Sequence, residues 1–341
     1  MNKKIIAWDL GATKCTAGIV DYDNDTNEFT CKKKYSLKLA DATSLDDLIY
    51  QLESSLNVDM AAADAVCIAG AGHYDGAALQ LQNGYPYPMQ IANVAAKRKW
   101  KCHDVIHDYS PIVCATFTSY MQQPGNIKLL KSGVNKPYGR RVAFGIGTSL
   151  GLKDGVLFPD GNFWLGQNEA GFIGVNVPPH ANQSDLQRHE EFIRFMQSTL
   201  NVKQQLTFEN ILSGRGTVSL HQFLYPQRAA STPEEIGANM CAGKTPELLD
   251  LFAWYIGLFI GTVELIFMPE GGVWITGGVT MNHLYLFDLP AIFAGIEASP
   301  AYQTQRLNYP LGVMSNDEHA LIGCGYYAVK RLDNFHWIDS R

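Results

Sequence analysis

Ile5-Ile6-Ala7-Trp8-Asp9-Leu10-Gly11-Ala12-Thr13-Lys14 is an apolar run that ends in a short polar turn, and an alternating run over residues 15–21 follows it. The pattern predicts two strands joined by a turn that carries an acid, a glycine and a hydroxyl group. A glycine turn lets backbone N–H groups approach a phosphate, and a carboxylate can hold Mg²⁺ through water. These residues suggest a site for ATP, although an ordinary β-hairpin with glycine at its turn fits the same pattern.

Two more glycine turns follow predicted buried strands. The first is Gly145-Ile146-Gly147-Thr148-Ser149-Leu150-Gly151, and the second is Gly277-Gly278. Thr13 and Thr148 each come just after a glycine-containing turn. This arrangement suggests two related halves, each of which offers one turn to the phosphates of a single ligand.

Six motifs then occur in order along nearly the whole chain. They are Asp9-x-Gly11-x-Thr13, Asp108 after an apolar strand, Gly145-x-Gly147-Thr148-x-x-Gly151, Glu169-Ala170-Gly171, Glu209 before Leu212-Ser213-Gly214, and Gly277-Gly278. The ordered set resembles the bacterial glucokinases, which belong to the hexokinase–actin–Hsp70 ATPase superfamily. No single motif carries the resemblance, which rests on the order.

The resemblance implies an α/β, two-domain ribonuclease-H-like fold of the actin/hexokinase type, with an active-site cleft between the domains. We expect a small domain over residues 1–109 and a large domain over residues 110–316. A C-terminal helix over residues 317–331 is expected to pack back on the small domain. A chain of 341 residues is long enough for two domains.

Hydrophobic periodicity and turn residues predict the main elements. We expect three strands over 4–37, helices over 44–56, 110–121, 184–200 and 246–267, a surface loop over 122–138, and a hairpin over 155–164. The 184–200 helix is expected to be capped by Ser184-Asp185.

The resemblance implies a role for each residue near the nucleotide. Asp108 ends an apolar strand and would be the catalytic base that takes the proton from the primary hydroxyl of the sugar. The same carboxylate could instead cap the helix that follows. Asp9 would place Mg²⁺ through water. The residues expected to bind ATP and its phosphates are Asp9, Leu10, Gly11, Ala12, Thr13, Lys14, Gly147, Thr148, Gly277 and Gly278.

The resemblance also implies a sugar site made of Asn83, His107, Glu169, Phe172 and Glu209. Two of these depart from the family pattern, which has Asn where this chain has His107 and His where it has Phe172. Phenylalanine cannot make the hydrogen bond of the histidine near the anomeric carbon. The expected reaction is therefore transfer of the γ-phosphoryl group of ATP to the 6-hydroxyl of glucose or a related hexose, with glucose a poor substrate.

Two other classes of function stay open. A non-catalytic or weakly active sugar-binding sensor on the same fold would explain His107 and Phe172, whereas Asp108 argues against it. A serine hydrolase would use Ser149, because residues 147–151 match the Gly-x-Ser-x-Gly nucleophile elbow. That elbow needs a helix after the serine, and the residues that follow read as a strand.

Composition limits the partners and the compartment. Hydrophobic residues make up 46% of the chain and charged residues 18%, as in a folded globular protein. A net charge of −6 argues against a nucleic-acid surface. The seven cysteines form no Cys-x-x-Cys pair and fit a reducing cytoplasm. We expect no signal peptide, no membrane span and a small-molecule sugar as the partner, with a homodimer left open.

Overall fold

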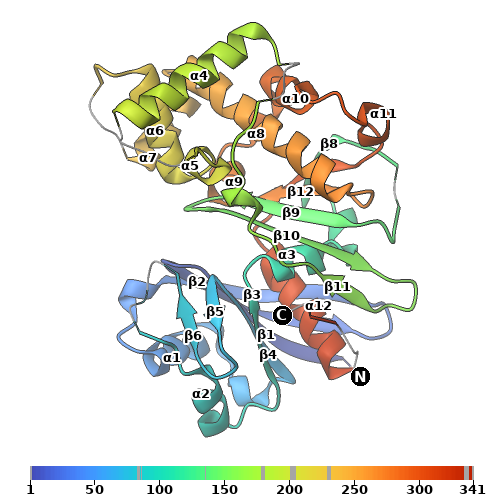
Figure 1. Ribbon diagram of the computed structural model, residues 1–341. Coiled ribbons are helices and arrows are strands. Elements are labelled where there is room, and N and C mark those ends of the chain that lie inside the picture. The colour runs from blue at the N-terminus through green and yellow to red at the C-terminus, as the bar shows by residue number, and fades with distance from the viewer. Residues whose placement is uncertain are drawn as a thin grey trace. The chain divides into compact units, whose positions relative to one another are not determined.

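The computed structural model describes residues 2–82, 85, 87–134, 136–177, 181–199, 205–228 and 232–333, and the backbone of 338–339. The chain forms two compact units (Figure 1). Unit 1 contains Met1–Ile127, Leu157–Leu165 and Asn316–Arg341, and unit 2 contains Lys128–Val156 and Gly166–Ser315.

Unit 1 is built on a five-stranded sheet with the order β3-β2-β1-β4-β7. Strands β1 and β2 form an antiparallel hairpin, and β1, β4 and β7 are parallel. The elements of unit 1 are β1 (Lys3–Leu10), β2 (Lys14–Asp23), β3 (Glu28–Lys38), α1 (Leu45–Leu56), β4 (Ala65–Gly70), β5 (Gly72–Tyr74), β6 (Leu79–Leu81), α2 (Ile91–Arg98), β7 (His103–His107), α3 (Ser110–Ala115), β11 (Phe163–Leu165), α12 (His319–Leu332) and β14 (Ile338–Asp339).

Alternate residues of β1 face opposite sides of this sheet, as the pleat requires. Ile6, Trp8 and Leu10 are fully buried in a core shared with α1 and α2. The other face carries Asp9 and packs against α12. Strand β1 therefore brings the Asp9 carboxylate to the helix-covered face at the carboxyl end of the sheet.

Unit 1 extends past the boundary that we expected at residue 110. Helix α3 packs against α12 so closely that a Cβ on Gly323 would lie 1.7 Å from the Pro111 carbonyl oxygen. Helix α3 is also shorter than the predicted 110–121. The hydroxyl groups of Thr116 and Thr118 donate hydrogen bonds to carbonyls three residues back, and a separate 3-10 turn follows at Ser119–Gln122.

Unit 2 repeats the local topology of unit 1. Its strands run β10-β9-β12-β13-β8, with β9 and β10 as an antiparallel hairpin and β9, β12 and β13 parallel. Four strands of each unit, β2-β1-β4-β7 and β10-β9-β12-β13, thus share one order and one set of directions, in agreement with the two related halves predicted from the glycine turns. The strands are β8 (Ile127–Lys131), β9 (Arg141–Ile146), β10 (Leu150–Leu157), β12 (Val273–Thr276) and β13 (Leu311–Met314).

Helix α8 forms the centre of the helical layer of unit 2, and Figure 1 shows it in orange beside α10. It is the one described helix long and apolar enough to span a membrane, and most of it is buried, as expected of a core helix. The helices of unit 2 are α4 (Gln183–Ser198), α5 (Phe208–Ile211), α6 (Gly214–Leu224), α7 (Pro233–Cys241), α8 (Pro246–Phe267), α9 (Gly278–Asn282), α10 (Pro290–Glu297) and α11 (Gln303–Arg306).

Two local predictions for unit 2 are wrong. The expected loop over 122–138 contains strand β8, which joins the sheet beside β13. Helix α4 is capped by Asn182, whose side-chain oxygen accepts a hydrogen bond from the Asp185 N–H at 2.9 Å, and not by Ser184-Asp185. Within the hairpin expected over 155–164, the turn is confirmed by the bond from the Phe158 N–H to the Asn162 carbonyl.

Candidate active site

The carboxyl ends of the parallel strands of unit 1 bring two predicted site segments together. Gly70 of β4 lies opposite Leu10 of β1 and opposite His107 of β7. The Gly11 turn and Asp108 therefore follow strands that end at the same edge of the sheet. Open α/β sheets bind ligands at this edge.

Asp9 lies in the electric field of two other carboxylates at this edge. The pKa of Asp9 is raised to about 6, chiefly by burial and then by the negative charge of Asp108; Lys14 lowers it and Asp317 adds a smaller rise. A carboxylate held close to other carboxylates gains stability from a cation. No sequence motif pointed to Asp317, which stands just before α12.

Asp108 is paired with the histidine that precedes it. The Nδ1 atom of His107 lies 3.0 Å from the Asp108 carboxylate, and the side chains are 39% and 24% exposed. The Tyr109 N–H lies 3.3 Å from the same Nδ1 atom, so this nitrogen accepts from Tyr109 when it carries no proton and can donate to Asp108 only when it carries one. Helix α3 has Tyr109, not Asp108, as its N-cap residue. The carboxylate is thus partly exposed at the sheet edge and does not occupy the N-cap position.

The first glycine turn is tight but sterically open. The Gly11 N–H donates to the Lys14 carbonyl at 3.0 Å, and a Cβ on Gly11 would meet only that oxygen, at an ordinary contact distance of 3.5 Å. Thr13 and Lys14 are exposed, and Ala12 is half-buried. The Leu10 side chain lies in the core, so that only its backbone can face a ligand.

The second and third glycine turns meet at the corresponding edge of unit 2. Thr276 of β12 lies opposite Gly145 of β9, and a Cβ on Gly147 would lie 3.9 Å from the Gly278 N. A Cβ on Gly278 would meet nothing within 4 Å, whereas one on Gly277 would clash with Ile146 at 2.4 Å. Gly277 also has a φ of 100°, so the fold requires glycine at position 277 but not at Gly147 or Gly278.

Helix α6 holds the Gly147 turn in place. The Gly214 N–H donates to the Gly147 carbonyl at 2.9 Å, and the Gly147 N–H donates to the Ser149 carbonyl at 3.0 Å. Thr148 is exposed at the tip. Strand β10 follows directly, so this turn joins a hairpin and the segment after Ser149 is a strand. The nucleophile elbow needs a helix there, and the hydrolase interpretation is therefore wrong.

Two of the predicted sugar carboxylates lie near the same turn. Glu209 is buried in α5, and its Oε2 atom accepts a hydrogen bond from the Leu150 N–H at 2.5 Å. Burial raises the pKa of Glu209 and so does the negative charge of Glu169, whereas the Leu150 N–H and Arg215 lower it. Glu169 is therefore close enough to interact with Glu209, although 40 residues separate them in sequence.

The segment that carries Glu169 and Phe172 is fixed against the β10 hairpin. It forms the 3-10 turn Ala170–Phe172, and a Cβ on Gly171 would lie 2.6 Å from the Leu150 carbonyl oxygen. Phe172 is 62% exposed, which leaves its ring available to a ligand. Its neighbour Gly174 forms a bridge with Thr207, the N-cap of α5.

Aromatic packing anchors both parts of this arrangement to α8. The Phe259 ring lies 4.9 Å from Phe208 and 5.0 Å from Phe144, between centroids. Phe208 precedes Glu209, and Phe144 lies on β9 just before the glycine turn. The helix core thus positions the turn and the carboxylate together.

The predicted site residues that the structure describes are divided between the two units. Unit 1 holds Asp9 to Lys14, His107 and Asp108, and unit 2 holds Gly147, Thr148, Glu169, Phe172, Glu209, Gly277 and Gly278. Asn83 lies outside the described residues. Within the part of the chain that the structure describes, no three His, Cys, Asp or Glu side chains form a metal site.

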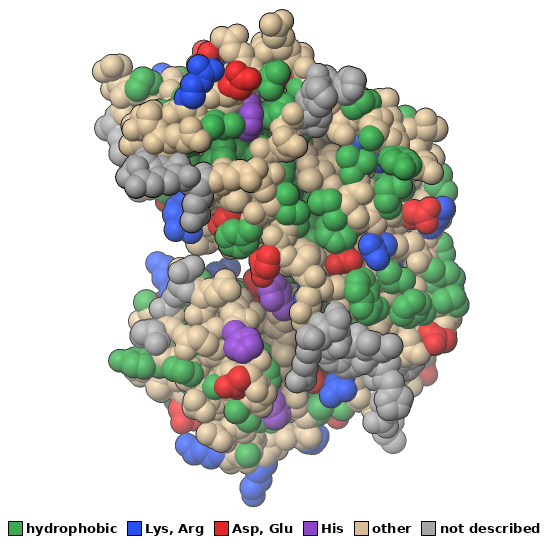
Figure 2. All heavy atoms as spheres, viewed as in Figure 1, with side chains coloured by type: hydrophobic (Ala, Val, Ile, Leu, Met, Phe, Trp, Pro, Cys, Tyr) green, Lys and Arg blue, Asp and Glu red, His purple; other side chains and the backbone are tan. Residues whose placement is uncertain are grey.

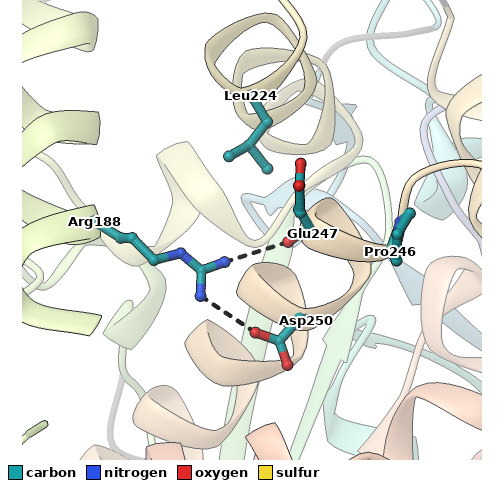
Figure 3. A pocket seen from close by; sticks show the side chains of 5 residues that line it. All are labelled: Arg188, Leu224, Pro246, Glu247 and Asp250. Atoms are coloured by element: carbon teal, nitrogen blue, oxygen red, sulfur yellow. Dashed lines mark hydrogen bonds and ion pairs between the residues drawn. The ribbon is translucent and has the colours of Figure 1, made fainter. Parts of the chain in front are cut away.

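A pocket of about 520 Å³ lies elsewhere in unit 2 (Figure 3). Arg188 of α4 crosses it to bond Asp250 at 3.2 Å and the Glu247 carbonyl at 3.4 Å. Leu224 and Pro246 complete its lining. None of the predicted site residues lines this pocket, and the Arg188 guanidinium is already paired with Asp250. The pocket is therefore not the predicted site.

Surface charge agrees with the low net charge of the chain. On the face shown in Figure 2, described Lys and Arg side chains lie scattered among acidic ones and form no continuous basic patch.

Comparison with known proteins tests the predicted family. The glucokinase from Brucella abortus biovar 1 (strain 9-941) is 26% identical over 336 residues, covering 95% of this chain and 90% of that one. The glucokinase from Saccharophagus degradans is 26% identical over 326 residues, covering 93% and 96%. These matches extend over nearly the whole chain.

Solved structures test the fold. The glucokinase from an Antarctic psychrotroph superimposes with a TM-score of 0.78 at 17% identity, covering 96% of this chain and 99% of that one. The glucokinase from Balamuthia mandrillaris in complex with glucose gives a TM-score of 0.73 at 16% identity, covering 96% and 94%. The predicted two-domain α/β fold of the actin/hexokinase type is confirmed.

The family model described as Glucokinase matches residues 6–331. This match covers all six motifs that carried the resemblance. The predicted activity, ATP-dependent phosphorylation of a hexose, is confirmed with the family, and ATP is the phosphoryl donor. The chain belongs to the glucokinase family.

Proposed function

We propose that Asp108 is the general base of this hexose kinase and that it takes the proton from the 6-hydroxyl of glucose or a related hexose. Phosphoryl transfer depends mainly on positioning, charge neutralisation and a base for the attacking hydroxyl. The observation that carries the proposal is the place of Asp108: a partly exposed carboxylate at the carboxyl edge of the unit 1 sheet, 3.0 Å from His107 Nδ1. Its proximity to the Gly11 turn supports the role.

We propose that three sterically open glycines receive the nucleotide. Gly11, Gly147 and Gly278 would each accept a Cβ without crowding, so folding alone does not explain glycine at these positions. Backbone that lacks a side chain lets N–H groups reach phosphate oxygens. The exposed hydroxyl groups of Thr13 and Thr148 add donors at the two turns. In this proposal Gly277 and Gly278 face the adenosine.

We propose that Mg²⁺ binds beside Asp9 through water. A Mg²⁺ ion held by one carboxylate, water and substrate phosphates does not need three protein ligands. The fit rests on Asp9, whose raised pKa reflects burial and the charges of Asp108 and Asp317. When bound, the ion would neutralise charge on the phosphoryl oxygens. Asp9 would orient one water of its shell.

We propose that the sugar contacts the carboxylates of Glu169 and Glu209. Glu209 uses Oε2 to hold the Leu150 N–H, and its second oxygen would accept a sugar hydroxyl. The exposed ring of Phe172 would pack against an apolar group of the sugar. Glucose should then be a poor substrate relative to other members of the family, because a hydroxyl against Phe172 would lose its hydrogen bond.

The test is an assay of ADP release with a panel of hexoses, amino sugars and acetamido sugars. We expect sugar-dependent ADP release, a product phosphorylated at the 6-hydroxyl by ³¹P NMR, and a lower kcat/KM for glucose than for the best substrate. Binding of sugars without any ADP release would instead support the sensor. We further propose a cytoplasmic location and, as an assembly to be tested by light scattering, a homodimer.

A further inference from the structure

One cysteine of this chain differs from the other six in exposure. All seven cysteines lie in the described residues and are free thiols, and Cys241 alone among them is exposed. Burial raises the pKa of five of the others, which are Cys15, Cys31, Cys67, Cys102 and Cys114. A raised pKa leaves little of the reactive thiolate near neutral pH.

Cys241 also belongs to a cluster of ionisable groups. Its Sγ atom lies 3.3 Å from Nδ1 of His283, and the Tyr285 hydroxyl lies 3.2 Å from the same nitrogen. A Cβ on Gly237 would lie 2.7 Å from Nε2 of His283, so α7 packs against the imidazole edge. The ring is therefore fixed beside the thiol.

The cluster has the protonation states that a thiol needs for activation. Burial lowers the pKa of His283, which keeps the imidazole neutral, so that one ring nitrogen can accept a proton. Burial raises the pKa of Tyr285, and so does its hydrogen bond with Cys241, so the hydroxyl stays protonated beside both the thiol and Nδ1. Cys241 is the last residue of α7, and Nδ1 of His283 lies within hydrogen-bond range of its sulfur. Removal of the thiol proton during the reaction should therefore depend on the imidazole.

We propose that Cys241 is a modification site that reacts with low-molecular-weight disulfides, with His283 as its base. The thiol proton passes to Nδ1 of His283, and the Cys241 sulfur attacks one sulfur of the disulfide. A new S–S bond forms, the original S–S bond breaks, and the departing thiolate takes up the proton from the imidazolium. One thiol and one disulfide give one mixed disulfide and one released thiol.

The site adjoins the third glycine turn. His283 directly follows α9, which begins at Gly278, and the Thr280 hydroxyl of α9 donates to the Gly277 carbonyl at 2.8 Å. An adduct on Cys241 would displace His283 and, through α9, this turn. On the proposed role of Gly277 and Gly278 at the adenosine, the adduct should raise the KM for ATP.

The test treats the full-length protein with glutathione disulfide and follows each cysteine by peptide mass spectrometry. We expect Cys241 to react at least about 10-fold faster than the half-buried Cys31 and Cys102, and His283→Gln to slow it by about 10-fold. Tyr285→Phe keeps the base but removes a hydroxyl that also contacts Cys241, so it should slow the reaction less than His283→Gln does. A rate at Cys241 no higher than at Cys31 would overturn the site, and this wild-type comparison needs no variant to fold.

Kinetics then test the link to the nucleotide separately. The adduct should raise the KM for ATP, dithiothreitol should restore it, and Cys241→Ser should be insensitive to the disulfide. Rapid labelling with an unchanged KM for ATP would overturn the link but leave the modification site in place. Because labelling is read by mass, it decides the site even if the proposed roles of the glycine turns fail.

Discussion

The Gly147→Ala variant tests whether glycine at this position is required for ATP binding or for folding. The added Cβ would lie 3.9 Å from both the Gly278 N and the Ser149 carbonyl oxygen, an ordinary contact, so the melting temperature should change little. If the turn receives a phosphate, the methyl group stands where the phosphate approaches and disrupts at least one backbone hydrogen bond. A hydrogen bond to a charged group contributes about 1.5–3 kcal/mol, which corresponds to a loss of roughly 10- to 150-fold in ATP affinity.

The assay is titration calorimetry with ATP, together with thermal unfolding of the same samples. Gly277→Ala is the matched control, because its Cβ would clash with Ile146 at 2.4 Å and its φ is 100°, so this variant should lower the melting temperature. Wild-type ATP affinity in a folded Gly147→Ala protein would refute the assignment of this turn to the phosphates.

Three further predictions concern the sugar site and the core. His107→Asn combined with Phe172→His should raise kcat/KM for glucose by roughly 5- to 150-fold in a steady-state assay, and no gain would show that these departures are neutral. Glu209→Gln should raise the KM for the sugar by about 10-fold with little change in melting temperature, and an unchanged KM would exclude it as a sugar ligand. Burial lowers the pKa of His189 from 6.5 to about 4, and its Nδ1 atom lies 2.9 Å from the Tyr255 hydroxyl. As the pH falls from 6.5 to 4, the imidazole therefore gains a proton in the unfolded chain before it does so in the folded protein. This difference lowers the free energy of unfolding by up to about 3 kcal/mol. In thermal melts, His189→Asn should show a smaller loss between these pH values than wild type, and an equal loss would contradict this account.

Elements with strong local signals were predictable from the sequence. Ser44 caps α1 by accepting a hydrogen bond from the Asp47 N–H, and the amphipathic run after it folds as predicted. Helix α8 has the predicted bounds, because its apolar residues are buried nearly all round and Pro246 stands at its first position. Strand β8 was missed because its pairing with β13 is a long-range contact, which short-range turn signals cannot reveal.

The sequence was sufficient to name the candidate site residues but not to predict the contacts between them. The motif order named Glu169 and Glu209, yet their segments meet through long-range backbone contacts, such as the bridge between Gly174 and Thr207 and the bond from the Phe208 N–H to the Ile173 carbonyl. The sequence placed His107 beside Asp108, but the 3.0 Å contact depends on the side-chain conformation at the strand end. The pair of Cys241 and His283 joins positions 42 residues apart and had no motif.

The most direct test of the central claim is the kcat of Asp108→Asn with the best hexose of the panel. Asparagine has the same shape and keeps an oxygen near His107, but it cannot take up the hydroxyl proton. The account predicts a fall in kcat of at least about 100-fold, with ATP and sugar dissociation constants close to those of wild type. A kcat near the wild-type value would contradict the role of Asp108 as the base.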